Sequence, residues 1–411
     1  MAMAEADQVR THTDRGPERG SLLLLLVLLG SLTAIGPLAM DMYLPAFPEM
    51  AASLSASPAQ VQLTLTTCLA GMAVGQFLIG PLSDRWGRRT PVIIGTVGFA
   101  LFSLLCAVAP NAATLTALRL GQGFTGGMGV VVSRAVVRDL FSGAAAARYY
   151  SRLTLIFGLA PIAAPSLGSL VLRFSSWRGI FVVLATLGAL LTLLVVLRLP
   201  ETLPPQRRSA AGLRPMARAI RVLAADRLYV GYTLAQGLVF AALFAYISGS
   251  SFVFQDVFGL SEATYSVVFG INSLGFVAFS QLNGALVTRR HPRRLLVTTL
   301  VVGVLATLAL LGGALVGSLL LVAPALLVFT SSLGMVQPNT MALALDPHPE
   351  RAGSASALLG TTQSLAGAFA APLVGLAGSG TALPMATVML IAMGTALLAV
   401  LTLARPSARR A

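Results

Sequence analysis

Long apolar segments recur along the whole chain, and they limit its possible folds more than any other feature. Each runs for about 20 residues, which is enough for one helix to cross the ~30 Å hydrocarbon core of a bilayer. About twelve such segments can be counted from Ser21 onwards. With 56% hydrophobic and only 10% charged residues, the chain has too little polar surface for a water-soluble domain. We therefore expect an all-α membrane protein.

The expected membrane spans follow one another with short connections. They cover residues 21–46, 58–80, 90–110, 112–137, 149–173, 178–199, 228–254, 263–287, 294–316, 318–342, 352–377 and 381–404. The first segment, which follows Arg15 and Arg19, also resembles a secretory signal peptide. Because it continues to Pro45 without a small-residue cleavage site, we interpret it as the first membrane helix.

The arginines indicate the orientation of the chain. They gather before the first span and after each even-numbered span, whereas the loops on the other side carry mainly Glu49, Asp256 and Glu262, with Arg173 and Arg178 as exceptions. Positive residues stay on the cytoplasmic side of a membrane. We expect a multi-pass protein of the bacterial cytoplasmic (inner) membrane with both termini in the cytoplasm. The net charge of +14 then reflects topology, and no nucleic-acid partner is expected.

Several kinds of chemistry are excluded by what the sequence lacks. It has no lysine, so it can form neither a phosphate-binding loop for ATP nor a Schiff base. His12, His291 and His348 lie outside the spans, and Cys68 and Cys106 are interpreted as small apolar residues. No metal-ligand cluster or nucleophile motif occurs. We expect no enzyme, no cofactor and no metal, and an ion gradient as the energy source.

A polar, proline-containing segment divides the chain near its middle. The predicted parts are a cytoplasmic N-terminal tail (1–20), an N-terminal six-helix bundle (21–199), a cytoplasmic linker (200–227), a C-terminal six-helix bundle (228–404) and a cytoplasmic tail (405–411).

The two halves show faint internal repetition. Gly71 and Gly80 recur as Gly275 and Gly284 at a constant offset of 204 residues, and the fifth span's Ala-Pro-x-x-Gly recurs in the eleventh. Such repeats are typical of transporters that bind their substrate between two related bundles.

The turn after the second span has an unusual density of charge and glycine. It reads GPLSDRWGRR and contains Gly80, Asp84, Arg85, Gly87, Arg88 and Arg89. This motif resembles the loop signature of the major facilitator superfamily, which implies the twelve-helix major facilitator fold. A carboxylate among arginines on a tight turn can form a latch that holds one conformation and releases in another. A simple topology signal would explain the arginines, although not Asp84 or the glycines.

Other motifs resemble particular branches of that superfamily. Arg119-Leu120-Gly121-Gln122-Gly123 is similar to a motif of proton-coupled members, and LAMDMYLPAFP (38–48) with SRAVVRDLFSG (133–143) resembles the bicyclomycin and chloramphenicol resistance branch of drug:proton antiporters. The fifth span resembles a degraded antiporter motif through Gly158, Pro161, Pro165 and Gly168. It lacks the usual GPxxGG ending, and Thr288 replaces Asp84 in the second half, which would weaken any latch there.

Asp41 is the carboxylate expected well inside a span, where a charge costs at least ~2.5 kcal/mol. Arg119 is its expected partner, because at 1.5 Å per residue both residues lie ~12 Å from the same membrane face and therefore at the same depth. Burial disfavours the ionised form of Asp41, whereas a nearby guanidinium favours it. A movement that changes the distance between Asp41 and Arg119 would therefore cause the carboxyl to take up or release a proton. The alternative is a static structural ion pair.

The resemblance implies a proton-coupled multidrug efflux antiporter that exports small amphipathic antibiotics of the phenicol or bicyclomycin type by alternating access. A cavity with one embedded carboxylate beside one arginine also suits neutral or weakly polar molecules. The alternative is a proton-coupled sugar or amino acid transporter of the same superfamily. The expected partners are the drug, protons and membrane lipids, and the protein is expected to be a monomer. Candidate substrate-cavity residues are Tyr43, Gln122, Gln236, Phe240, Asn272 and Gln337.

Overall fold

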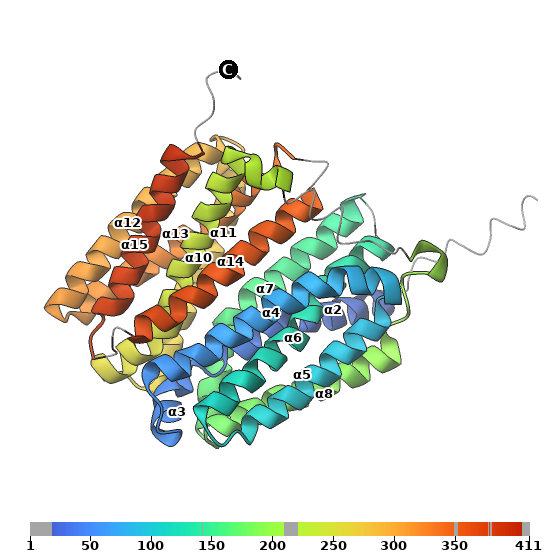
Figure 1. Cartoon of the computed structure of the whole chain (residues 1–411), viewed down its shortest axis with the longest axis horizontal. Coiled ribbons are helices and arrows are strands. Elements are labelled where there is room, and N and C mark those ends of the chain that lie inside the picture. Colours follow the sequence, from blue (N-terminus) through green and yellow to red (C-terminus); the bar gives the residue numbers. More distant parts are fainter. Residues whose placement is uncertain are drawn as a thin grey trace, which may run out of the picture.

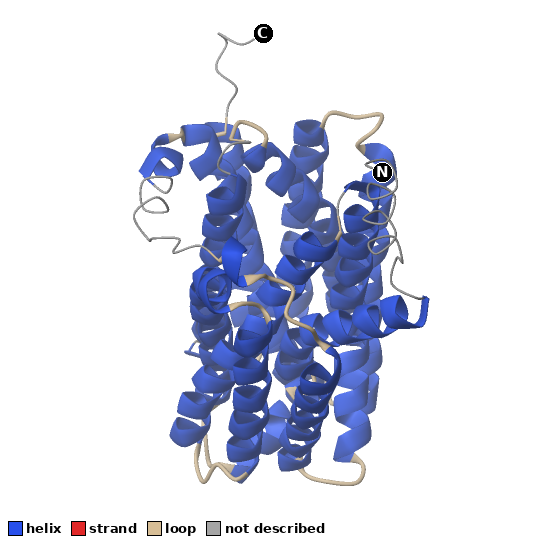
Figure 2. Ribbon diagram, turned by 90° about the vertical axis from the view of Figure 1, so that its right-hand side faces the viewer, coloured by secondary structure: helices blue, strands red, loops and turns tan. Residues whose placement is uncertain are grey.

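The computed structural model describes residues 19–141, 143–208, 221–348, 352–376, 378 and 380–404. Within these ranges the chain consists of helices and connecting loops without any strand (Figure 2). Residues 1–18, 405–411 and most of the expected linker (209–220) lie outside the described part. The prediction of an all-α fold is confirmed.

Six long helices and two short ones form the first half. They are α2 (Arg19–Asp41), η1 (Leu44–Ala46), α3 (Phe47–Ser53), α4 (Pro58–Trp86), α5 (Arg89–Ala107), α6 (Ala112–Leu140), α7 (Gly143–Leu172) and α8 (Trp177–Arg198). The short η2 (Pro205–Arg207) follows α8. We call the long helices of this half the N-terminal bundle.

The second half has the same number of long helices. They are α10 (Arg227–Phe252), which continues into the π-helical η3 (Val253–Val257), α11 (Glu262–Leu286), α12 (Pro292–Val316), α13 (Leu319–Leu345), α14 (Ala352–Leu376) and α15 (Leu383–Thr402). We call them the C-terminal bundle. Figure 1 shows the two bundles side by side.

Nine of these long helices, some joined to the short helix that follows, are both long and apolar enough to cross a membrane within the described residues. The remaining three, α6, α7 and α14, have 29, 30 and 25 residues and are also long enough to span a bilayer. Polar residues such as Arg119 lower the hydropathy of α6. Twelve helices of spanning length therefore agree with the fold expected from the sequence.

Local sequence signals fix where several helices begin and end. Ser57 and Gln60 form a capping box at the start of α4, and the Asn111 side chain accepts a hydrogen bond from the Thr114 backbone N–H at the start of α6. Gly317 has a positive φ of 64° and ends α12 in the left-handed region. Because these signals are local, the expected spans and the observed helices differ by only a few residues at most ends.

The first span differs from its expected form. We expected one segment over 21–46, whereas α2 ends at Asp41 and the chain passes through η1 into α3. Pro45 explains the break, since proline lacks a backbone N–H and disfavours a helical residue before it. Asp41 therefore lies at a break between two helical segments rather than within a continuous helix.

Glycines allow α4 and α6 to pack backbone against backbone. A Cβ atom added at Gly71 or Gly75 would overlap the backbone of α6, and one added at Gly123 or Gly127 would overlap the backbone of α4. In the C-terminal bundle, Gly334 of α13 approaches the backbone of α11 in the same way. Small residues drive this close approach because helices in lipid associate through van der Waals packing.

The two bundles meet mainly through two helix pairs, α4 with α14 and α7 with α11. We call the end of the molecule with the α4–α5 and α11–α12 turns the arginine-rich end, and the end with η1, α3 and η3 the opposite end. Figure 1 shows α4 of the N-terminal bundle beside α14 of the C-terminal bundle.

Hydrogen bonds between the bundles, within the described part of the chain, lie at the opposite end. The Gln62 amide donates to the Ser248 carbonyl at 3.1 Å, and the Ser251 hydroxyl donates to the Leu44 carbonyl at 2.6 Å. The Ser169 hydroxyl donates to the Glu262 carbonyl at 3.1 Å. The molecule is thus closed at the opposite end.

The packing of α4 on α6 predicts the effect of adding one methyl group. Gly123→Ala should lower the free energy of unfolding by about 1–3 kcal/mol, because the new Cβ would collide with the Cys68 backbone, which cannot move aside. Thermal unfolding of the purified protein in detergent measures the change. Gly312→Ala is the matched control, since nothing lies within 4 Å of a Cβ added in this other long helix. Equal melting temperatures for the two variants would contradict the packing argument.

Candidate functional site

Asp41 is buried between the bundles, with a side chain only 6% exposed. It comes from the N-terminal bundle, yet it interacts electrostatically with Tyr246 of α10 and Tyr265 of α11. No hydrogen bond or ion pair joins it to another described residue. The buried carboxyl group therefore has phenol groups of the C-terminal bundle in its electrostatic surroundings.

Arg119 occupies a different, fully buried place inside the N-terminal bundle. Its guanidinium lies 4.3 Å from the centre of the Tyr43 ring and 5.7 Å from that of Phe181, which are cation–π distances. Its Nη1 donates to the Gln122 side-chain oxygen, and its Nε donates to the Thr64 carbonyl at 3.4 Å. Nη2 has no hydrogen-bond partner. One donor of this buried guanidinium thus remains available to another acceptor.

The expected contact between Asp41 and Arg119 is not formed in this structure. No ion pair or hydrogen bond joins Arg119 to Asp41 within the described residues, and the Tyr43 ring lies over the guanidinium. Residues two apart on a helical turn point in directions about 200° apart. When Tyr43 covers the guanidinium, Asp41 must therefore face the other bundle. The sequence predicts that the two residues lie at the same depth, and depth alone carries no information on direction.

A polar and aromatic cluster of the C-terminal bundle surrounds the phenols that Asp41 faces. The Asn272 amide donates to the Tyr246 hydroxyl at 2.9 Å, and the Tyr246 ring stacks on Phe269 with the centres 5.6 Å apart. The Tyr265 and Ser250 hydroxyls are 3.1 Å apart. Sequence reasoning missed Tyr265. A buried hydroxyl in a span needs a partner for the same reason as a carboxyl, and that signal could have found it.

The other candidate cavity residues do not form one group. Tyr43 and Gln122 both contact Arg119, and Gln122 donates to the Ser103 hydroxyl at 2.7 Å. Gln236 is buried and its side-chain oxygen has no partner. The remaining two are Phe240, which packs on Phe244 with the ring centres 4.9 Å apart, and Gln337, which is exposed.

The residues of the fifth-span motif lie in α7, the helix that meets α11 across the interface. Gly168 lies directly on the Met42 carbonyl, next to the break after α2. The Pro165 carbonyl accepts a hydrogen bond of 3.1 Å from the Ser266 hydroxyl of α11. Pro161 is partly buried in the same helix. Gly158 also belongs to α7, and its surroundings lie outside the described detail. This part of α7 thus connects the two bundles at the opposite end.

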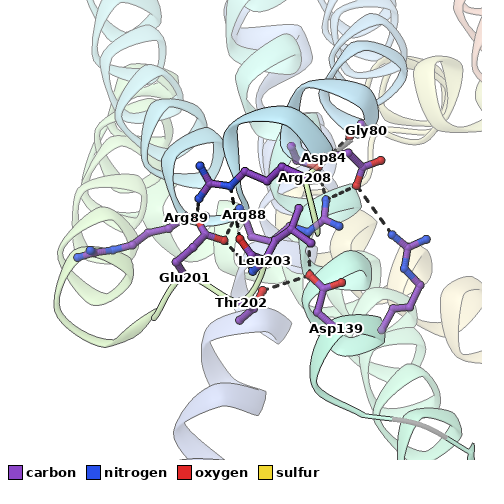
Figure 3. Close-up of polar contacts among 11 residues, drawn as sticks. Gly80, Asp84, Arg88, Arg89, Asp139, Glu201, Thr202, Leu203 and Arg208 are labelled. Carbon is purple, nitrogen blue, oxygen red and sulfur yellow. Dashed lines mark hydrogen bonds and ion pairs between the residues drawn. The ribbon is translucent and has the colours of Figure 1, made fainter. Parts of the chain in front are cut away.

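The turn after α4 contains a network of charges around Arg88 (Figure 3). The Arg88 side chain is only 2% exposed and donates to Asp84 and Ser83, both at 2.7 Å, and to Asp139 of α6 at 2.8 Å. Thr202 also donates to Asp139, at 3.2 Å. Burial opposes the charge on Arg88, but the two carboxylates raise the pKa of the guanidinium above its ordinary value. The motif therefore links α4, α6 and the segment after α8.

Glu201 extends this network from the other side of the turn. Its carboxylate accepts hydrogen bonds from the backbone N–H groups of Arg88 at 2.8 Å and Arg89 at 3.3 Å, and Arg208 lies 3.8 Å away. Gly87 has a positive φ of 91°, and a Cβ added there would overlap the Glu201 carboxylate. The structure places Glu201 at the N-terminus of α5, where backbone donors favour an anion.

The remaining motif residues lie at the edge of this network. Arg85 is exposed, and Gly80 has open space around it. The Arg89 guanidinium donates to the Val196 carbonyl at 2.6 Å and so ties the start of α5 to the end of α8. The described residues contain no group of three His, Cys, Asp or Glu that could hold a metal ion.

Comparisons with known proteins show what the chain resembles. The family model described as "Major Facilitator Superfamily" matches residues 29–371. An uncharacterised MFS-type transporter, YdgK of Bacillus subtilis, is 43% identical over 92% of this chain and 94% of its own length. A bicyclomycin resistance protein homolog of Haemophilus influenzae is 34% identical over 90% and 93%.

A solved structure gives the same fold. The crystal structure of the D323A mutant of the nucleoside transporter NupG superposes with a TM-score of 0.75, at 14% identity and over 92% of this chain and 98% of the other. At this identity the likeness concerns the fold alone.

The environment of Glu201 predicts a pH-dependent contribution to stability. Burial disfavours the carboxylate, but the N–H groups of Arg88, Leu203 and Arg89, together with Arg208, hold the pKa of Glu201 below its usual value of 4.5. A lowered pKa stabilises the fold above the usual value, and this stability is lost as the pH falls through the lowered pKa. Glu201→Gln should therefore melt at a lower temperature than the unmodified protein at pH 5 and above.

Below pH 4.5 that difference should shrink, because the unmodified carboxyl becomes protonated as well. Melting curves of both proteins across this range test the prediction, with the exposed Asp346→Asn as the control. A difference that stays constant at all pH values would show that the charge of Glu201 does not matter.

Proposed function

The chain belongs to the major facilitator superfamily, and we propose that it is a proton-coupled exporter of small amphipathic antibiotics. The relative named as a bicyclomycin resistance protein homolog, which matches over 90% of the chain, supports this class of substrate. The observation on which the proton coupling rests is the buried carboxyl group of Asp41 at the interface of the two bundles.

The arginine-rich end is proposed to face the cytoplasm of a bacterial inner membrane, as the distribution of positive charge favours. The closed opposite end then faces outwards. In this orientation the structure corresponds to a state in which the outer gate is shut by contacts such as those of Gln62 with Ser248 and Ser251 with Leu44. The N-terminal bundle (21–199) and the C-terminal bundle (228–404) are proposed to rock about the site while the linker (200–227) joins them.

The proton step follows from the surroundings of Asp41. An ionised carboxylate without a cation in a membrane interior is costly, so this arrangement accommodates the neutral acid next to the Tyr246 and Tyr265 hydroxyls. When the outer gate opens, α10 and α11 must move away from α2, which exposes Asp41 to water and allows it to exchange its proton. The exposure of the Asp41 carboxyl to water therefore depends on the relative tilt of the two bundles, because the phenols near it belong to the other bundle.

Arg119 is proposed to act on the substrate side of the same cycle. Its unpartnered Nη2 can donate a hydrogen bond to a carbonyl or hydroxyl oxygen, groups that neutral amphipathic antibiotics carry. Tyr43, which covers the guanidinium, lies two residues after Asp41. A shift of this short segment would therefore move the Asp41 carboxyl together with the Tyr43 ring that covers the Arg119 guanidinium. Proton exchange at Asp41 would then be coupled to drug binding at Arg119.

The network around Arg88 is proposed to act as a conformational latch. All its described members belong to the N-terminal bundle and the segment just after it, so it holds the α4–α5 turn against α6 and the start of the linker. Rocking of the bundles pulls on that linker. Breaking the network should therefore change the rate of conformational exchange more than the affinity for the drug.

The function is tested by drug accumulation in an efflux-deficient bacterium that expresses the protein. We expect less labelled chloramphenicol or bicyclomycin to accumulate than in the empty host, and we expect a protonophore to abolish the difference. An unchanged accumulation for a panel of antibiotics would contradict drug export. A difference that survives the protonophore would contradict proton coupling.

Asp41→Asn should reduce export to the level of the empty host while the protein still inserts and folds. The amide resembles the neutral acid, so the closed state remains accessible, but it cannot release a proton. The same accumulation assay, with membrane abundance measured by immunoblot, checks this. Asp256→Asn, an exposed carboxyl at the same end, should leave export unchanged. Full export by Asp41→Asn would remove Asp41 from the mechanism.

Arg119→Lys should retain part of the export activity, and Arg119→Ala should retain none. Lysine keeps the charge near Tyr43 but loses the planar fork that reaches Gln122 and Thr64 at once, so we expect a rate lower by about tenfold. Initial efflux rates from preloaded cells measure this. Arg173→Ala, an exposed arginine at the opposite end, is the control. Equal rates for Lys and Ala variants would show that the charge itself is unimportant.

A further inference from the structure

The turn between α11 and α12 concentrates positive charge without any acidic partner. It contains Arg289, Arg290, His291, Arg293 and Arg294, and none of these forms an ion pair with a carboxylate in the described part of the chain. Four arginines that share a short turn repel one another unless an anion lies nearby. The turn therefore lacks a counter-charge of its own.

The related turn of the N-terminal bundle shows the contrast. There Asp84 and Asp139 bind Arg88, and Glu201 lies beside Arg89. At the offset of 204 residues, Thr288 stands where the first half has Asp84. The preference of positive residues for the cytoplasmic side explains the arginines at both turns. It does not explain why carboxylates of the protein neutralise the arginines at only one of them.

A groove runs from this turn along the C-terminal bundle. It has a volume of about 790 Å³ and lies between α11 and α12, with α13 as its floor. Arg290 and Arg294 line it at the arginine-rich end. The rest is lined by apolar side chains such as Phe279, Val302 and Val328, together with the hydroxyl-bearing Thr298, Thr299, Ser331 and Ser332. A second recess of about 550 Å³ shares Arg294 and contains His291 and Arg293. Charge is thus confined to one end of a groove whose remaining lining is uncharged and mostly apolar.

The groove faces the surroundings of the protein rather than the interface of the bundles. Phe279 is 41%, Val302 39% and Val328 46% exposed. α12 packs against α13 and α15 of its own bundle, and Figure 1 shows it at the outer edge of the molecule. In a membrane this face meets lipid.

The dimensions of the groove suit one leaflet of a bilayer. On α11 it extends from Gly275 to Leu286, which is ~16 Å at 1.5 Å per residue. Half of the ~30 Å hydrocarbon core is ~15 Å. An acyl chain that lies in the groove would thus bring its headgroup to the level of Arg290 and Arg294.

We propose that this groove is a binding site for an anionic phospholipid of the arginine-rich leaflet. One acyl chain lies along α11 and α12, and Arg290 and Arg294 bind the phosphate through charge-assisted hydrogen bonds. The start of α12 adds the positive end of the helix dipole, which favours an anion. His291 and Arg293 in the neighbouring recess would contact the polar end of the headgroup. The lipid supplies the counter-charge that the turn lacks.

Lipid binding to the purified full-length protein tests the charge at the mouth of the groove. Phosphatidylglycerol and phosphatidylcholine are titrated separately into detergent micelles, and native mass spectrometry counts the bound lipid. We expect phosphatidylglycerol to bind more tightly. The double variant Arg290→Gln with Arg294→Gln removes two charges and should weaken the binding of phosphatidylglycerol by about thirtyfold. Each arginine near an anionic lipid contributes about 1 kcal/mol, and about 2 kcal/mol corresponds to this change in affinity.

The matched control is Arg221→Gln with Arg227→Gln, which removes two exposed arginines of the same end that lie outside the groove. We expect it to change the affinity by less than about threefold, as the charges lie away from the bound phosphate. Equal affinity for both lipids, or an equal loss in both double variants, would overturn the proposal, because either result would mean that the groove selects no headgroup.

The apolar part of the site is tested by filling it. Val302→Trp places a large ring in the groove and should prevent the binding of phosphatidylglycerol, whereas Val301→Trp, equally exposed at 39% on the neighbouring position, should not. This pair decides the question even if the arginine variants fail to fold. Normal binding by Val302→Trp would overturn the proposal.

A soluble anion is separated from a lipid by competition. Inorganic phosphate and glycerol phosphate, added at millimolar concentration, should displace little phosphatidylglycerol because they cannot occupy the apolar groove. Complete displacement by either compound would mean that the arginines bind free phosphate and that the lipid assignment is wrong.

Discussion

The cost of an unpartnered polar group in hydrocarbon governs this structure. It forces the backbone into helices, and it directs each buried polar side chain towards a partner. Arg119 meets this constraint inside one bundle, through Tyr43, Gln122 and the Thr64 carbonyl. Asp41 forms no hydrogen bond or ion pair within the described residues, and the phenols that it influences electrostatically, Tyr246 and Tyr265, belong to the other bundle. A group whose partners belong to a second moving body is sensitive to motion, and this is the physical basis of the proposed proton coupling.

Close packing inside each bundle makes that motion one of rigid bodies. Gly71 and Gly123 bring the backbones of α4 and α6 together, and Gly334 does the same for α13 and α11. Between the bundles the described hydrogen bonds are few and lie at one end, where hydroxyl and amide groups such as Ser251 and Gln62 donate to backbone carbonyls. Strong contacts within bundles and sparse contacts between them allow the interface to open without unfolding either half.

The two related turns show how a repeated architecture can acquire different roles. In the first, carboxylates of α4, α6 and the segment after α8 neutralise the arginines, so that the turn is a closed network. In the second, Thr288 replaces the acidic residue, and the arginines open onto an apolar groove. The same need for a counter-charge is met by the protein in one case and, in our proposal, by the membrane in the other.

The sequence by itself determined the helical fold, the approximate ends of the long helices and the family, because these depend on apolar length, capping residues and local motifs. The residues of the loop motif, Asp84 and Arg88 above all, were also found from sequence, since they are neighbours along the chain. Only the tertiary structure decided the partners of Asp41. Tyr43, which lies against Arg119, is only two residues from Asp41, which does not, and helix depth does not record direction. The break before Pro45 and the positions of Tyr265 and Glu201 likewise depend on contacts between segments far apart in the chain, which the apolar pattern of each segment does not encode.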